Sequence, residues 1–183
     1  MPGLVESPSM RSTRGMKDSL VIARCTCGQV EIEAWGKPIA SVICHCDDCQ
    51  AAGRMLAELE NAPPLLDAAG GTGNVLYRKD RVRPAKGGHL LAAHKLTPDS
   101  KTNRMVAKCC NAPMAITFDD ARHWVPLYRD RLEGVVPPVQ WRICTKFVPA
   151  GVDLPDDVPG YAMYPFGMMA GLALSAVAML VAR

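Results

Sequence analysis

The sequence predicts a mainly β fold with a short internal helix and an apolar helix at the C-terminus. Three observations support this prediction. Short runs rich in β-branched and aromatic residues recur between residues 20 and 128, and Gly, Pro and Asn separate them. Two aspartates at positions 47 and 48 introduce a run of helical character, and residues 161–182 carry no charged side chain. We therefore expect a β domain followed by a separate terminal helix.

The expected strands lie in a domain that covers residues 20–148. Residues 1–19 mix Pro, Gly, Ser and charge without periodicity, so we expect a disordered leader. Residues 149–160, rich in Pro and Asp, are interpreted as a linker. The strands are expected at residues 20–24, 30–35, 39–43, 75–77, 89–94, 104–108, 114–118 and 124–128.

The internal helix is expected to begin after Asp47 and Asp48, which can cap it, and to extend toward Leu59. Cys49 would lie in its first turn, where the helix dipole and free amides lower the pKa of a thiol. The Gly-rich residues 67–74 lack the Lys-Ser/Thr pair of a phosphate-binding loop, which favours a tight turn between strands.

The uncharged residues 161–182 predict the terminal helix, over residues 166–182 with Pro165 at its start. Their length reaches that of a membrane span, and residues 167–171 match the pattern of small residues at helix contacts. Since the Ala, Gly and Met content is only mildly apolar, we favour packing on the sheet or on a second copy of the chain. Membrane contact stays open as the alternative.

Composition excludes several classes of protein. The 183 residues are enough for one packed domain with an additional segment. The net charge of +3 is small, Lys and Arg are dispersed, and neither a Cys2His2 spacing nor a basic helix is present. Nucleic acid is therefore not expected as a partner. Residues 1–17 lack the apolar core of a signal peptide, so a reducing, cytoplasmic location is expected.

The cysteines predict metal sites. Seven of the eight fall in three clusters, whereas Cys144 stands alone and is interpreted as a buried free thiol. Cys-x-Cys and Cys-Cys spacings make poor disulfides within a loop. Thiolates so close together can instead converge on a tetrahedral zinc ion, with bonds of about 2.3 Å. The clustered residues are Cys25, Cys27, Cys44, Cys46, Cys49, Cys109 and Cys110.

In these motifs the chain resembles the glutathione-dependent formaldehyde-activating (GFA) family, which includes centromere-protein-V-like proteins. It looks most like an uncharacterised bacterial branch, with which it shares the loop at residues 67–72. The resemblance implies an Mss4-like β fold with two zinc ions. The motifs that carry it are Cys25-Thr26-Cys27-Gly28, Cys44-His45-Cys46-Asp47-Asp48-Cys49-Gln50 and Cys110-Asn111-Ala112-Pro113.

Carried over from the family, Cys25 and Cys27 join the downstream cysteines in a closed structural site. The family usually has Cys-x-x-Cys-Gly downstream, but here Ala107 takes the first position and Asn111 replaces the Gly. Cys109 must then bind from beside Cys110. Neighbouring side chains of a strand point to opposite faces, so both can bind only if the backbone kinks. Otherwise His123 or a water would complete the site.

The second zinc of the family would be held by three cysteines, which are our predicted catalytic residues. Its fourth position is open to a substrate thiol. The resemblance implies a carbon–sulfur lyase that joins a thiol such as glutathione to an aldehyde such as formaldehyde. The three residues are Cys44, Cys46 and Cys49.

Other roles around this zinc stay open at the level of sequence. His45, between two ligands, is expected to face away or to contact a substrate. Asp47, Asp48 or His45 would act as the acid–base group. The candidates for holding substrate carboxylates are Arg54, Lys79 and Arg81.

The alternative function is a non-catalytic zinc module for protein interaction or membrane tethering, since a fold does not fix a function. A cysteine nucleophile with His and Asp partners is less favoured, because clustered cysteines bind metal before they act alone.

Overall fold

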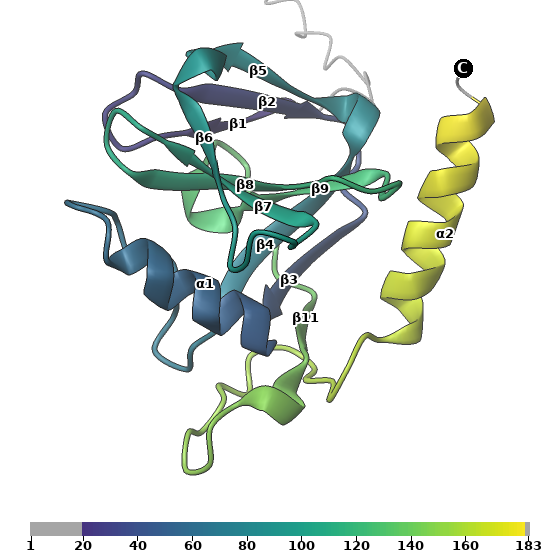
Figure 1. Cartoon of the computed structure of the whole chain (residues 1–183). Coiled ribbons are helices and arrows are strands. Elements are labelled where there is room, and N and C mark those ends of the chain that lie inside the picture. The colour runs from purple at the N-terminus through teal and green to yellow at the C-terminus, as the bar shows by residue number, and fades with distance from the viewer. Residues whose placement is uncertain (1–19, 182–183) are drawn as a thin grey trace, which may run out of the picture.

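A computed structural model describes residues 20–181 and shows two β-sheets and two helices (Figure 1). This architecture confirms the mainly β fold with a short helix and an apolar C-terminal helix. The predicted disordered leader, residues 1–19, lies outside the described residues. The helices are α1 (Asp47–Ala57) and α2 (Phe166–Val181). The strands are β1 (Leu20–Arg24), β2 (Glu31–Trp35), β3 (Ala40–Cys44), β4 (Thr72–Arg78), β5 (Val82–Lys86), β6 (Leu91–His94), β7 (Thr102–Ala107), β8 (Ala112–Phe118), β9 (Trp124–Tyr128), β10 (Leu132–Glu133) and β11 (Trp141–Ile143).

The smaller sheet has four strands in the order β10-β1-β2-β5, and the larger has seven in the order β11-β3-β4-β9-β8-β7-β6. All pairs are antiparallel except β11 with β3, which run parallel. The eight strands expected from sequence are present, β1 and β9 with the expected bounds and the others with shifted ends, but β5, β10 and β11 were not expected. β5 is almost fully exposed and contains Pro84, and the other two are only two and three residues long. None of them shows an alternating pattern.

The larger sheet forms the middle layer of the molecule. Side chains of successive residues in a strand point to opposite faces. In β4, Val75 and Tyr77 therefore join the core between the two sheets, whereas Leu76 joins the core beneath α2. A third group of buried side chains, which includes Leu56 of α1 and Ile116 of β8, packs α1 on the same outer face. The helices thus cover one face of the larger sheet and the smaller sheet covers the other.

α1 begins at Asp47, with Cys46 at its N-cap position, and neither aspartate caps it with its side chain, contrary to the sequence interpretation. Asp47 and Asp48 instead occupy the first turn, where negative charge complements the helix dipole. The Gln50 side chain fixes the orientation of the helix start, because its amide donates to the carbonyl oxygens of His45 (2.7 Å) and Phe147 (2.9 Å). The end of β3 is thereby held against α1.

α2 follows Pro165, as predicted, and packs on the larger sheet through Met168, Leu172 and Ser175. The imidazole Nε2 of His123 lies 2.9 Å from the Leu172 carbonyl oxygen and 2.8 Å from the Ser175 hydroxyl. Within residues 20–181, no helix combines the length and apolar character that crossing a bilayer requires, and α2 has only sixteen residues.

Gly71, just before β4, has no room for a side chain. A Cβ atom there would lie 2.5 Å from Ile43 Cγ2 and 2.6 Å from His45 Cε1, so the end of β3 depends on this glycine. Gly71→Ala should lower the free energy of unfolding by about 1–3 kcal/mol because it overpacks a buried contact. Chemical denaturation would measure the change. Gly160→Ala is the control, because its nearest atom is 3.7 Å away. Equal stability of the two variants would contradict the prediction.

Candidate metal centres and the adjoining cavity

The first cysteine cluster joins the two sheets. Cys25 and Cys27 follow β1 in the smaller sheet, while Cys109 and Cys110 lie between β7 and β8 in the larger sheet. Cys109 Sγ is 3.3 Å from that of Cys27 and 3.8 Å from that of Cys25, and all four sulfur atoms lie within 4.8 Å of one another. Four thiolates around a tetrahedral zinc would be separated by about 3.8 Å, given bonds of about 2.3 Å. The cluster therefore has the size of a closed zinc site.

The cluster includes Cys109, whose participation was an open question. β7 ends at Ala107, earlier than expected, and residues 108–111 form a turn in which the Cys110 amide donates to the Ala107 carbonyl. Because a turn lacks the alternation of a strand, both thiols can face the same point. Asn111 has φ 52°, a left-handed conformation that Asn tolerates and that explains how it can replace the Gly of the family motif. His123 contacts α2 and is not in the cluster.

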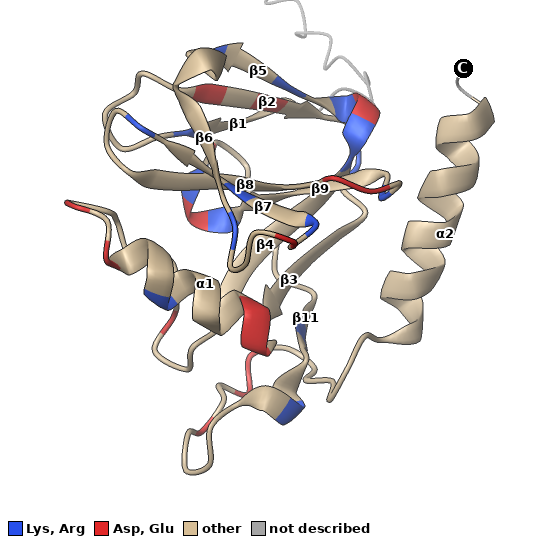
Figure 2. Cartoon of the chain, viewed as in Figure 1, with Lys and Arg blue, Asp and Glu red and all other residues tan. Residues whose placement is uncertain are grey.

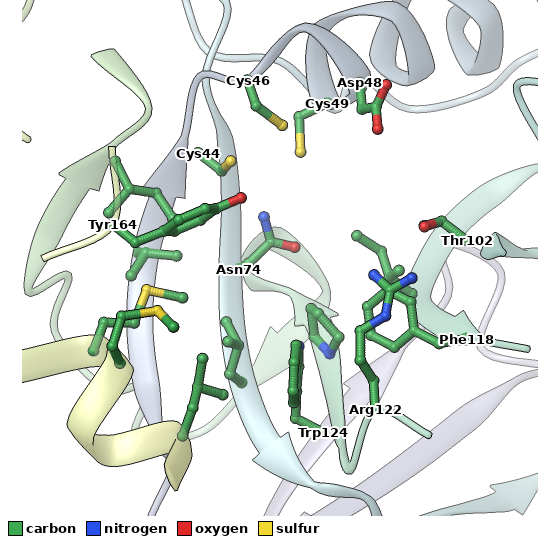
Figure 3. A pocket seen from close by; sticks show the side chains of 18 of the residues that line it. Cys44, Cys46, Asp48, Cys49, Asn74, Thr102, Phe118, Arg122, Trp124 and Tyr164 are labelled. Carbon is green, nitrogen blue, oxygen red and sulfur yellow. The ribbon is translucent and has the colours of Figure 1, made fainter. Parts of the chain in front are cut away.

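The second cluster lies where β3 meets α1. Cys44 ends β3, Cys46 immediately precedes α1 and Cys49 lies in its first turn. Their three sulfur atoms lie within 4.8 Å of one another and converge on one point, as Figure 3 shows. A tetrahedral ion held by three thiolates keeps one coordination position for another ligand.

The pKa values of these thiols shift in opposite directions because the thiols hydrogen-bond with one another. Hydrogen bonds with Cys44 and Cys49 lower the pKa of Cys46 to about 2, with a smaller contribution from the backbone amides of the first helical turn. The pKa of Cys44 is raised, first by its hydrogen bond with Cys144 and then by those with Cys46 and Cys49. Without metal, one thiolate thus forms at the expense of its neighbours, and a bound cation would allow all three to ionise.

The sequence interpretation placed the lowered pKa at Cys49. In the structure a hydrogen bond from Cys44 lowers the pKa of Cys49, but contact with Cys46 and burial outweigh it and raise the pKa to about 12. The helix-start thiol with the lowered pKa is Cys46, one residue before α1. The expectation named the wrong residue, and the backbone amides that it invoked lower the pKa of Cys46 less than the hydrogen bonds with Cys44 and Cys49 do.

A cavity of about 350 Å³ adjoins the second cluster, between α1 and α2 on the outer face of the larger sheet. Four neighbouring strands supply most of its floor through residues of alternating positions, which share that face, and Val42 of β3 and Ile143 of β11 add to it. Cys44, Cys46, Cys49 and Asp48 lie at one end, while Trp124 and Arg122 lie at the other (Figure 3). The floor residues are Asn74, Leu76, Thr102, Arg104, Ile116, Phe118, Trp124 and Pro126.

Two buried polar atoms in this floor have no hydrogen-bond partner within the described part of the chain. They are Asn74 Oδ1, an acceptor, and Arg104 Nη1, a donor. Asn74 is 4% exposed and Arg104 2%. The other Arg104 nitrogen, Nη2, donates to the Asp48 carbonyl at 3.2 Å, and the guanidinium acts electrostatically on Cys49. Unpaired buried polar groups cost free energy, so both atoms point to a polar occupant of the cavity.

Cys144 lies beside the second cluster, although the sequence gives it no partner. β11 pairs in parallel with β3 so that Ile143 is opposite Cys44. Cys144 follows in a left-handed conformation, φ 58°, and its thiol hydrogen-bonds with Cys44 and Tyr164. Those hydrogen bonds, led by the one with Cys44, lower the pKa of Cys144.

The other residues considered from sequence are separated by the fold. His45 is fully buried away from the cavity, as expected, and burial lowers its pKa. Asp48 lines the cavity but Asp47 does not. The three basic candidates for binding carboxylates, Arg54, Lys79 and Arg81, do not line it either.

Arg104 and Arg122 are the basic residues of the cavity, and sequence reasoning missed both. Arg104 could have been identified from the sequence, because it lies two residues before apolar Val106 and therefore on the same, buried face of the strand.

Comparisons with known proteins give one family match. The model of the family described as glutathione-dependent formaldehyde-activating enzyme matches residues 20–60, which contain both cysteine motifs of the N-terminal half. No curated protein matches the chain. Among solved structures, the chain is similar to the crystal structure of a Rhodobacter sphaeroides protein. The two share 16% sequence identity with a TM-score of 0.46, over 76% of this chain and 99% of that chain.

The two clusters predict about two zinc ions per chain. Cys46→Ser and Cys109→Ser should each lower the zinc content to about one, as elemental analysis would measure. Cys109→Ser should also unfold at lower denaturant concentration than Cys46→Ser, because its cluster joins the two sheets. Full zinc content in either variant would show that the substituted residue does not bind metal.

Proposed function

We propose that this chain is a GFA-like protein, as the match over residues 20–60 supports, and that it is a zinc-dependent carbon–sulfur lyase. Its reaction joins a small thiol to an aldehyde, or separates their adduct. The family description names glutathione and formaldehyde, and these are the first thiol and aldehyde to test. We also place the protein in the cytoplasm, where thiols stay reduced.

The observation that carries this proposal is the difference between the two clusters. The first has four thiols that can close a tetrahedral site, and none of them lines the cavity. The second has three thiols, all of which line the cavity. At the second site, the coordination position that no protein side chain fills would therefore face the cavity, where a substrate could bind. Structural zinc sites are closed, whereas catalytic ones keep such a position.

The residues of the cavity suggest how the bond would form. Bound zinc would supply the positive charge that favours a substrate thiolate. Asp48, beside Cys49, takes the thiol proton (Figure 3). The sulfur then bonds to the aldehyde carbon, and the electron pair of the C=O π bond moves to oxygen. The free Nη1 of Arg104 donates a hydrogen bond to that oxygen, which finally receives the proton from Asp48.

The acid–base role is tested by Asp48→Asn against Asp47→Asn. The two aspartates are adjacent on α1, but only Asp48 lines the cavity. NMR exchange spectroscopy would measure the rate of adduct formation above the spontaneous rate. We expect Asp48→Asn to lower the catalysed rate by about a hundredfold and Asp47→Asn to leave it unchanged. If wild-type protein accelerates the reaction of no small thiol with formaldehyde, the lyase function is wrong.

One observation favours a non-catalytic zinc module instead. The Cys144 thiol contacts Cys44, so a small movement of either side chain would offer the second site a fourth thiolate. That site would then be closed and structural.

Cys144→Ser separates the two functions. For the lyase we expect the zinc content and the rate of zinc loss to a chelator to stay at wild-type values, because three cysteines and a substrate position hold the ion. Faster zinc loss, with a zinc content that falls toward one per chain, would identify Cys144 as a ligand and favour the structural module. A colorimetric chelator assay would measure both quantities.

A further inference from the structure

We propose that the thiol accepted at this site carries an extended apolar group, such as an arylalkyl or medium-chain alkyl group. This inference rests on the proposed function and names the substrate class of the same site. It follows from the lining of the cavity, the charges available in it and the position of α2.

The part of the cavity away from the cysteines is lined mostly by apolar side chains, and the Arg122 guanidinium there is already paired with Asp120. Leu76 and Pro126 lie in the middle of the floor, since they pair directly across β4 and β9. Trp124 lies beyond them, toward α2, and Phe118 packs edge-to-face against it with ring centroids 5.8 Å apart. α2 adds Met168, Met169 and Leu172. A substrate bound through sulfur at the cysteines would extend its remaining atoms along this surface, where apolar groups gain free energy by leaving water.

The charges of the cavity do not match a peptide thiol such as glutathione, which has two carboxylates and an ammonium group. Arg122 already pairs with Asp120 at 2.6 Å, and its guanidinium lies 3.8 Å from the centroid of the Phe118 ring. Arg104 lies at the sulfur end, close enough to Cys49 to act on it electrostatically. Two carboxylates would therefore lose hydration without gaining two free cations.

The polar atoms without partners lie at the cysteine end. Asn74 Oδ1 and Arg104 Nη1 can accept from and donate to a hydroxyl or carbonyl oxygen near the new carbon–sulfur bond. Leu76 and Pro126, which pair across β4 and β9 two positions further along from Asn74, are apolar. The cavity is thus polar at its reacting end and apolar along its length, which suits a thiol with one apolar substituent.

α2 is an integral wall of this cavity. Its docking is specific, because His123 contacts the Leu172 carbonyl and the Ser175 hydroxyl. No residue of α2 is charged, as Figure 2 shows, so it offers the substrate only apolar contacts. Met169 is 49% exposed yet lines the cavity, whereas Leu174 is 70% exposed and does not. These two residues give a matched pair of substitutions.

The test is isothermal titration of zinc-loaded protein with three thiols: 2-phenylethanethiol, 2-mercaptoethanol and glutathione. We expect 2-phenylethanethiol to bind at least about tenfold more tightly than either of the others. Met169→Gln should weaken binding of 2-phenylethanethiol about fivefold and leave 2-mercaptoethanol unaffected, because only the longer thiol reaches α2. Leu174→Gln should change neither affinity. Circular dichroism and zinc content would establish that both variants fold.

Equal affinities for 2-phenylethanethiol and 2-mercaptoethanol, or tighter binding of glutathione, would overturn this inference and leave the lyase function standing. Binding of none of the three thiols would overturn both. An equal loss of 2-phenylethanethiol affinity in Met169→Gln and Leu174→Gln would show that α2 does not contact the substrate, and would also contradict the inference.

Discussion

This structure depends on seven thiols that lie in two groups. Within each group the sulfur atoms are within 4.8 Å of one another. Thiolates at such distances repel one another unless a cation lies between them. The pKa shifts of Cys44 and Cys46 are opposed because their thiols hydrogen-bond with one another and with Cys49. The first group fixes the turn after β1 to the turn after β7, and so holds the two sheets together. The second fixes the end of β3 to the start of α1.

The second group adjoins a cavity on the outer face of the larger sheet. α1 and α2 cover the same face but leave the floor between them open, so the three thiols lie at one end of a cavity. Arg104 and Asn74 bring polar atoms to that end, and α2 makes the opposite end apolar. Three clustered thiols, an acidic side chain and an apolar surface thus meet on one face of the larger sheet.

Local patterns predicted much of this arrangement. The cysteine spacings located both clusters, and alternating residues located the central strands, because each signal lies within a few neighbouring residues. Features that depend on distant pairing could not be predicted. Cys144 reaches Cys44 only because β11 adds to β3 in parallel. Arg104 of β7 reaches the Asp48 carbonyl of α1 only because the fold brings these distant segments together. β7 ends at Ala107, and the turn that follows allows Cys109 to face the cluster. The expected strand extended to residue 108, so this turn was not predicted.

The separation of metal ligands and α2 along the chain has an evolutionary consequence. The residues of the second metal cluster lie within six positions near the N-terminal end, whereas the apolar wall comes from a helix more than a hundred residues later. Mutations in that helix can change the size and polarity of the space without altering any cysteine. A lineage could therefore diversify the compounds it handles by drift in one terminal segment, while the reactive centre stays the same.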